Sequence, residues 1–292
     1  MNAKSEVSVL NGMSNVLTDV RRHLATELKL RQSVIKPLDL VQRALKDPHK
    51  NAVALHEATV LLEQPPAELA LPGEYNKLVK KLRTIADENL SELEFTFARD
   101  LRQAFQEHGA TLEGPPSELV AGLFVIRPDL RKKQVAITFS RQPVSKNVKL
   151  DIEKVVNAFQ RAQKEICERK VDHKELLGEL FEAYSRQLKL QGKAMGARIS
   201  IVDCYRELVI VRQPVGFRRT PAKNSFVDYP KTHFAYDMLE LRRKQQLSHD
   251  GHRLNFTTAT IDVGSDTTRA MFLATGALQG QFVKDLSFEK GK

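Results

Sequence analysis

The chain has 292 residues, of which 41% are hydrophobic, and a net charge of +10. This length suits two domains better than one, and the apolar content is enough for a buried core, which excludes a disordered chain. The two cysteines, Cys167 and Cys204, are too few for a disulfide framework and too far apart for a metal knuckle. We therefore expect a reducing, cytoplasmic location, and the excess of Lys and Arg makes a nucleic-acid partner plausible.

The first 15 residues are polar and lack the apolar run of a signal peptide. No later stretch reaches the 18 consecutive apolar residues that a membrane-spanning helix needs. The sequence thus predicts no membrane partner.

The first 110 residues are predicted to be helical. Apolar residues recur at every fourth position at Val16, Val20, Leu24 and Leu28. This spacing predicts one apolar stripe on an amphipathic helix. Pro37 is expected to begin a second, short helix, because proline is tolerated in a first helical turn. A third helix is predicted over 51–63, ending before Pro65 and Pro66.

The strongest helical pattern runs from Glu74 to His108, with Gly109 as its C-terminal cap. At 1.5 Å per residue, such a helix is roughly 50 Å long. It can bury its apolar stripe in an intramolecular bundle with the earlier helices or in a coiled coil with another chain. Asn89 interrupts the stripe and no sustained leucine heptad is present, which favours the bundle.

The pattern changes after Gly114-Pro115-Pro116. Alternating apolar residues over 135–139, preceded by an apolar run over 119–126, predict a β-hairpin with one buried face. We interpret Arg127-Pro128-Asp129 as its turn. The fold class is therefore α+β, with a helical N-terminal module over 1–110 and a mixed module with β-hairpins over 117–292.

Two helices are predicted next, around 152–166 and 177–188, the second capped by Asp172. The segment 198–202 is expected to be extended, and the conformation from there to 213 is left open. A helix is predicted over 231–247. The strands predicted over 256–263 and 270–274 are expected to pair with each other across Gly264–Thr268.

No complete catalytic motif occurs, so the sequence predicts neither catalytic residues, nor a cofactor, nor a metal site. The octapeptide Ile261–Thr268 resembles the first phosphate-binding hairpin of the actin and sugar-kinase ATPases. That fold begins with the hairpin, whereas here only 24 residues follow it, so we interpret it as a polar turn. His249-Asp250-Gly251-His252 offers two imidazoles and one carboxylate, whereas a closed metal site needs a fourth ligand, and Asp-Gly is typical of a hairpin turn.

Clustered basic residues remain as the candidate site. The predicted hairpin tip and the loop after residue 212 carry Arg131, Lys132, Lys133, Arg141, Arg218, Arg219 and Lys223. Such clusters can contact phosphates, and Phe217, Phe226 and Tyr229 could supply stacking surfaces. The alternative is that these cations are merely solvated faces and loops.

Three functions are consistent with these features. The first is a non-enzymatic subunit that contacts DNA or RNA through its basic module and a protein partner through its N-terminal helices. Accessory proteins of bacterial genome-maintenance and phage-defence complexes have such an architecture. The second is a metal-dependent nuclease or hydrolase assembled from scattered acids, of which the candidates are Asp203, Glu207, Asp228 and Asp237. The third is a purely structural coiled-coil protein.

Overall fold

The computed structural model describes residues 3–264 and 266–291. Helices fill the N-terminal part and antiparallel sheets follow with further helices, so the predicted α+β class is confirmed. The chain divides into two compact units, residues 1–97 and 98–292. This division falls inside a long helix and not at the Gly114-Pro115-Pro116 break, because the last turns of that helix, with Leu101 and Phe105, are buried in the second unit.

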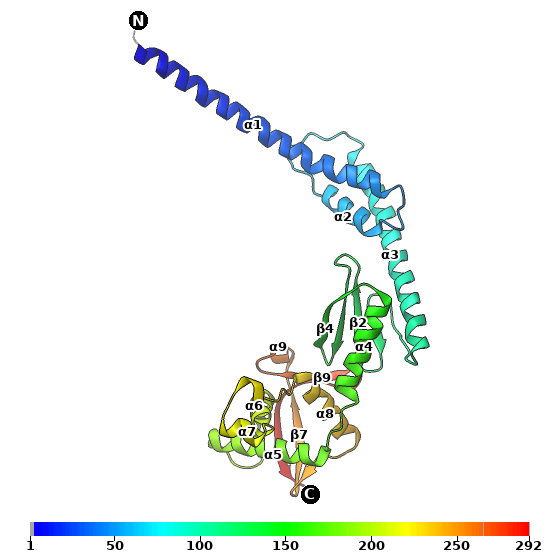
Figure 1. Cartoon of the computed structure of the whole chain (residues 1–292), viewed down its shortest axis with the longest axis vertical. Helices are drawn as coiled ribbons and strands as arrows, with labels where there is room; N and C mark the ends of the chain where they lie inside the picture. Colours follow the sequence, from blue (N-terminus) through cyan, green and yellow to red (C-terminus); the bar gives the residue numbers. More distant parts are fainter. Residues whose placement is uncertain (1–2, 265, 292) are drawn as a thin grey trace. The chain divides into compact units, whose positions relative to one another are not determined.

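The first unit consists of α1 (Ala3–Ala44), α2 (Ala52–Leu62) and the part of α3 (Tyr75–Glu107) up to residue 97. Figure 1 shows the C-terminal half of α1 lying against α2 while its N-terminal half extends beyond it. Buried side chains from all three helices form one core: Val34, Val41, Ala44, Leu55, Ala58, Leu62, Tyr75, Val79, Leu82 and Ala86. The Tyr75 hydroxyl also donates to the Leu62 carbonyl oxygen at 2.9 Å, which satisfies the end of α2.

The expected break at Pro37 is wrong, because α1 continues through it. Proline removes one hydrogen bond from the helix interior, the bond to the carbonyl oxygen of Ser33. Pro37 is buried, and Val34 and Val41 on either side of it lie in the core. Packing on both sides of the proline therefore maintains a helix that local preference would end.

The second unit begins with an antiparallel sheet in the order β1 (Leu119–Ala121), β2 (Phe124–Asp129), β3 (Gln134–Phe139), β4 (Gln142–Lys149). The alternation predicted for β3 is confirmed, since Val135, Ile137 and Phe139 are buried and the residues between them are not.

The interpretation of Arg127-Pro128-Asp129 as a turn is wrong. These residues belong to β2 and pair with Ala136, Val135 and Gln134. The turn is instead 130–133, where an Asp129 carboxylate oxygen accepts the Lys132 amide at 3.0 Å and Lys133 has φ of 53°. Asp129 thus caps the turn from the last position of the strand.

Helix α4 (Ile152–Cys167) packs on this sheet through an aromatic cluster. The ring of Phe159 lies 4.9 Å from that of Phe105 and 5.5 Å from that of Phe124. Phe124 in turn lies 5.7 Å from Phe139 of β3. One phenylalanine of α4 therefore joins the helix to the end of α3 and to the sheet.

A second antiparallel sheet has the order β5 (Ile199–Ser200), β9 (Gly280–Lys290), β7 (His252–Thr258), β6 (Ser248–His249), and β8 (Met271–Ala274) also pairs with β9. The expected direct pairing of 256–263 with 270–274 is wrong, since β7 and β8 each pair with β9. A helical turn, α9 (Ile261–Gly264), occupies part of the expected strand. Of the phosphate-loop octapeptide, Ser265 lies outside the described residues.

Helices α5 (His173–Leu190), α6 (Ile201–Val211) and α8 (Lys231–Arg243) pack on this sheet. The short helix α7 (Val215–Arg219) and a 3₁₀ turn (Lys223–Ser225) lie in the segment between α6 and α8. The predicted cap of α5 is confirmed, since Asp172 accepts the amides of Lys174 and Glu175. The extended segment near 198–202 is shorter than expected, because the Ser200 hydroxyl caps α6 through the Asp203 amide. No helix among the described residues is long and apolar enough to span a membrane.

Replacing Phe159 with Ala should destabilise the second unit by about 3–5 kcal/mol, because the side chain joins three elements and leaves a cavity when it is removed. Urea unfolding followed by circular dichroism measures this change. Phe95 is 63% exposed, so Phe95→Ala is the matched control and should change stability little. Equal stability of the two variants would contradict the role given to Phe159.

Candidate nucleic-acid interface

The predicted basic hairpin tip exists and lies at the turn between β2 and β3. Lys132 makes an ion pair with Asp129, with a nitrogen–oxygen distance of 3.3 Å. Hydrogen bonds from the Lys132 backbone amide and side chain, and the nearby charge of that lysine, lower the pKa of the Asp129 carboxyl. The carboxylate is therefore ionised at neutral pH and offsets part of the charge of the tip.

Strand β4 lies beside this turn at the edge of the sheet. Lys149 pairs with Gln134, and the Leu150 amide donates to the Lys133 carbonyl oxygen at 3.0 Å. The register shifts between Val135 and Ile137, so that two residues of β4, Lys146 and Asn147, lie opposite the single residue Ala136 of β3, and Asn147 has φ of 57°. Such a bulge changes the direction of the side chains around it.

Helix α4 brings two more cations to the same place. Its buried face contains Val155, Val156 and Phe159, and the position of this face fixes the direction of the other side chains. Lys154 and Arg161 are seven residues apart, which places them on one exposed stripe of the helix, with Ala158 between them.

A groove of about 510 Å³ lies between β4 and this stripe. It is lined by Ser145, Lys146, Val148, Lys149, Lys154, Asn157, Ala158 and Arg161. The lining thus contains four cations and no carboxylate. Among the described residues, none of these four side chains makes an ion pair with an acid.

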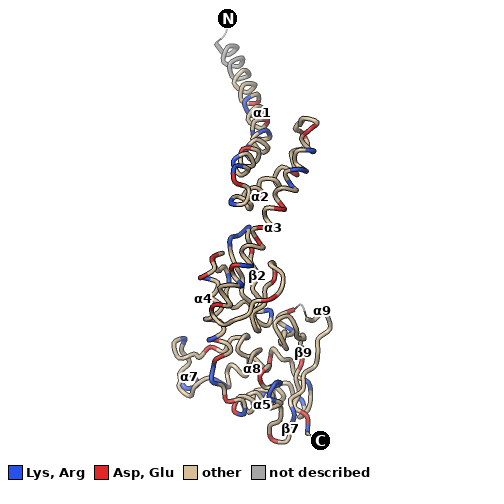
Figure 2. Tube along the Cα trace, turned by 90° about the vertical axis from the view of Figure 1, so that its right-hand side faces the viewer, with Lys and Arg blue, Asp and Glu red and all other residues tan. Residues whose placement is uncertain are grey.

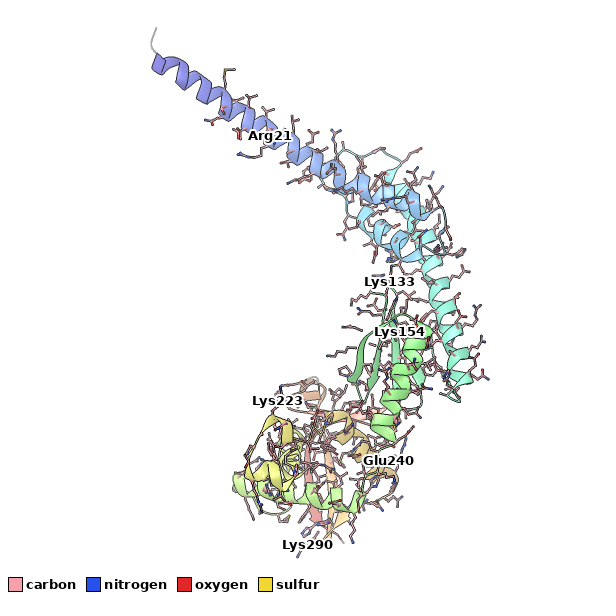
Figure 3. All side chains as sticks on the ribbon, in the orientation of Figure 1. Arg21, Lys133, Lys154, Lys223, Glu240 and Lys290 are labelled. Atoms are coloured by element: carbon pink, nitrogen blue, oxygen red, sulfur yellow. The ribbon has the colours of Figure 1, made fainter. Side chains whose placement is uncertain are left out.

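We call Lys133 together with these four cations the α4 basic face. Figure 3 shows Lys133 and Lys154 at the same end of the β2–β4 sheet. Figure 2 shows both Lys or Arg positions and Asp or Glu positions around the labels β2 and α4. Two acids close to this face have other partners. Asp151 caps α4 by accepting a hydrogen bond from the Lys154 backbone amide, and Asp129 makes an ion pair with Lys132.

Arg141 does not belong to this face, although the sequence predicted it as a site residue. It lies in the turn between β3 and β4, at the other end of β3 from Lys133. Its guanidinium lies 4.4 Å from the ring centre of Phe272 and 5.0 Å from that of Phe282. The neighbouring Ser140 hydroxyl donates to the Phe272 carbonyl oxygen, so this turn joins the two sheets.

The predicted site cations Arg218, Arg219 and Lys223 also lie outside the α4 basic face. Arg218 donates to the carbonyl oxygens of Gln213 and Val211, which closes the end of α6. Arg219 and Lys223 are exposed, but Figure 3 shows Lys223 beside α6 and α7, away from Lys133 and Lys154.

Of the three aromatic residues predicted to stack on bases, not all are accessible. Tyr229 is buried, and the Phe217 ring contacts Phe226 at 5.5 Å. Only this phenylalanine pair remains partly accessible, since Phe217 is half-buried and Phe226 is 40% exposed.

None of the four cations that line the groove, Lys146, Lys149, Lys154 and Arg161, is among the site residues predicted from the sequence. Lys154 and Arg161 lie in a segment whose apolar spacing predicts a helix, and that spacing does not show what lies beside the polar face. Their seven-residue spacing was a usable signal, but it gains meaning only when β4 is known to lie alongside.

The four acids proposed for a metal-dependent hydrolase do not converge. Asp203 pairs with Arg206, Glu207 pairs with Arg186, and Asp228 is exposed. Within the described part of the chain, no group of three His, Cys, Asp or Glu residues could hold a metal ion. The His249-Asp250-Gly251-His252 segment forms the β6–β7 turn, with positive φ at both central residues.

The fourth acid, Asp237, is buried in a polar network of α8. It accepts from Arg169 at 2.6 Å and from the Tyr229 hydroxyl at 2.6 Å. Burial, and then the charge of Asp237, raise the pKa of Tyr229, so its hydroxyl remains a donor. The network fixes the loop before α8 and uses both carboxylate oxygens.

Replacing Asp237 with Ala should destabilise the second unit by about 3 kcal/mol, because it leaves Arg169 and the Tyr229 hydroxyl without their acceptor. Chemical unfolding is the measurement, with the exposed Asp228→Ala as control. A loss no larger than that of the control would show that the network contributes little to stability.

The cysteines provide a test of the local environment. Both are free thiols, and burial, followed by the charge of Glu240, raises the pKa of Cys167 to about 11. Burial also raises the pKa of Cys204 well above its usual value. Because only the thiolate reacts, both residues should resist alkylation at neutral pH.

Alkylation by iodoacetamide, followed by mass spectrometry, should be slow at Cys167 near pH 8 and accelerate about tenfold per pH unit up to its pKa. In urea the reaction should be faster by roughly two orders of magnitude at pH 8, since an unfolded thiol has a pKa of about 8.5. Rapid labelling of the folded chain at pH 8 would contradict the buried environment.

Comparison of the chain with protein-family models, with curated proteins and with solved structures gives no match.

Proposed function

We propose that this protein binds nucleic acid through the α4 basic face and acts as a non-enzymatic subunit of a larger assembly. One observation carries the proposal: four cations from a strand and a helix line a single groove that contains no carboxylate. Such an arrangement suits a ligand with closely spaced negative charges, and a nucleic-acid backbone is the commonest macromolecule of this kind.

Protection of an exposed edge strand, which needs no ligand, explains only part of this cluster of cations. Lysines and a bulge on an edge strand prevent pairing with other chains, and this accounts for Lys146 and Lys149 on β4. It does not account for Lys154 and Arg161, because a helix has no edge to protect. The two strand lysines and the two helix cations line the same groove, and this supports the proposal that the groove binds a ligand.

The chemistry of the face favours contacts to phosphates over contacts to bases. Its groups are ammonium and guanidinium ions on flexible side chains, together with the neutral Ser145 and Asn157. Phosphate contacts add affinity and position the partner, but they do not distinguish sequences. Binding to DNA or RNA should therefore depend strongly on salt and weakly on sequence.

The remaining parts of the proposal concern location and assembly. Both cysteines are free, which fits the reducing cytoplasm proposed as the location. The helical first unit is proposed to bring the protein into its assembly, while the second unit contacts nucleic acid.

The test is a variant with Lys146, Lys149 and Lys154 changed to Gln and Arg161 changed to Gln. It should bind DNA and RNA more weakly in fluorescence anisotropy, and the slope of log affinity against log salt should fall by up to about 3.6 on duplex DNA, at roughly 0.9 per phosphate contact. Changing Arg131, Lys132 and Lys133 to Ser should reduce the slope by less than about 2.7, since Lys132 already pairs with Asp129.

A control of equal charge comes from the same unit. Lys174, Lys189, Arg253 and Lys290 are exposed on α5, β7 and β9, and their change to Gln should leave the salt slope close to that of the parent. Figure 3 shows Lys290 at the opposite end of the unit from Lys154. Equal weakening by the two quadruple variants would mean that only net charge matters, and a folded groove variant that binds like the parent would refute the proposal.

A further inference from the structure

The apolar stripe of α1 is covered along only part of its length. Its C-terminal half, with Val34 and Val41, lies in the core of the first unit. Its N-terminal half exposes a row of large apolar side chains, each more than half accessible: Met13, Val16, Leu17, Val20, Leu24 and Leu28. A helical segment without tertiary packing is marginal in water, so this half needs a partner to cover the stripe.

An open apolar groove adjoins the exposed stripe. It has a volume of about 880 Å³ and lies between α1, the connector before α3 and the first turns of α3. Its apolar lining includes Leu30, Val34, Ile35, Leu38, Leu71 and Leu78. Ile35 and Leu78 remain 52% and 46% exposed, so the groove is not filled by the unit itself.

We propose that the groove binds residues 13–24 of α1 from a second copy of this chain, and that the second copy's groove binds the same segment of the first. Stripe and groove lie on one helix, so an antiparallel, twofold arrangement covers both in both chains at once. Such an interface is isologous and closed, whereas a different protein helix in the groove would leave the α1 stripe exposed.

The charges at the two surfaces are complementary. The groove is rimmed by Glu68 and Glu74 and by Lys77 and Lys81, none of which makes an ion pair with another described residue. Segment 13–24 carries Arg21 on one flank of its stripe and Asp19 on the other, and Asp19 already pairs with Arg22 of its own helix at 3.1 Å. A second copy therefore brings Arg21, which makes no ion pair with another described residue, to a rim that offers the acids Glu68 and Glu74.

The area is sufficient for a reversible dimer. The exposed stripe from residue 13 to 28, which includes the segment 13–24 and ends at Leu28 beside the groove, is roughly 24 Å long and about 10 Å wide. The dimer covers two such stripes and two grooves, or on the order of 1,000 Å². This is the lower limit of specific interfaces, so dimerisation should depend on concentration.

Sedimentation analysis of the full chain should show a monomer–dimer equilibrium. Leu17 and Leu24 are 68% and 58% exposed, so their joint change to Asp should preserve the fold, checked by circular dichroism. It should weaken dimerisation at least about a hundredfold. Thr18→Asp with Ala25→Asp places the same charges on the opposite face of the same helix and should leave the dimer unchanged.

Cysteine cross-linking tests the orientation. The joint variant Leu17→Cys and Ile35→Cys should form disulfide-linked dimers on oxidation, because Leu17 of one copy enters the groove lined by Ile35 of the other. Leu17→Cys alone should not, since a self-contact at this position requires parallel helices. A parent chain that stays monomeric, a dimer indifferent to the Leu17 and Leu24 changes, or efficient cross-linking by Leu17→Cys alone would each overturn the proposal.

Discussion

The packing of Phe159 between α3 and the first sheet is the constraint on which the second unit's surface depends. Its ring contacts Phe105 and Phe124 at 4.9 and 5.5 Å, which fixes the rotation of α4 about its own axis. With the apolar face of α4 held in this way, Lys154 and Arg161 can only point along the edge of β4. The position of the two α4 cations in the groove therefore follows from apolar packing in the core, because the contacts of Phe159 orient the helix.

In the first unit, helix α1 is instead divided along its length. There α1 buries Val34 and Val41 and leaves Leu17 and Leu24 exposed along one continuous stripe. The difference is that α4 turns a charged face to solvent, whereas α1 turns an apolar one. A charged face suits an ionic ligand in water, and an apolar face calls for another helix. The two units are therefore suited to different partners.

Several cations of this chain stabilise the fold and are not available for a ligand. Arg141 stacks on Phe272 and Phe282, and Arg218 closes the end of α6 through two carbonyl oxygens. The net charge therefore overestimates the number of cations that are available to bind a ligand. The cations of the groove differ, because no carboxylate lines the groove and none of the four makes an ion pair with a described acid.

The sequence by itself determined the α+β class, the long α3 helix, the Asp172 cap and the alternation in β3. These features depend on periodicity and on side chains close in sequence, which a linear pattern contains. It also identified the turn cations at 131–133, because turns are rich in polar residues that a short window reveals.

Only the tertiary structure decided which strands pair, whether α1 continues through Pro37, and which cations meet. Strand β9 pairs with both β7 and β8, a choice made by long-range hydrogen bonds that no local pattern encodes. Pro37 is retained in α1 because packing on both sides of it compensates for one lost hydrogen bond. Lys149 and Lys154 share a groove because a helix folds back on an edge strand, and the distance between side chains is a property of the fold.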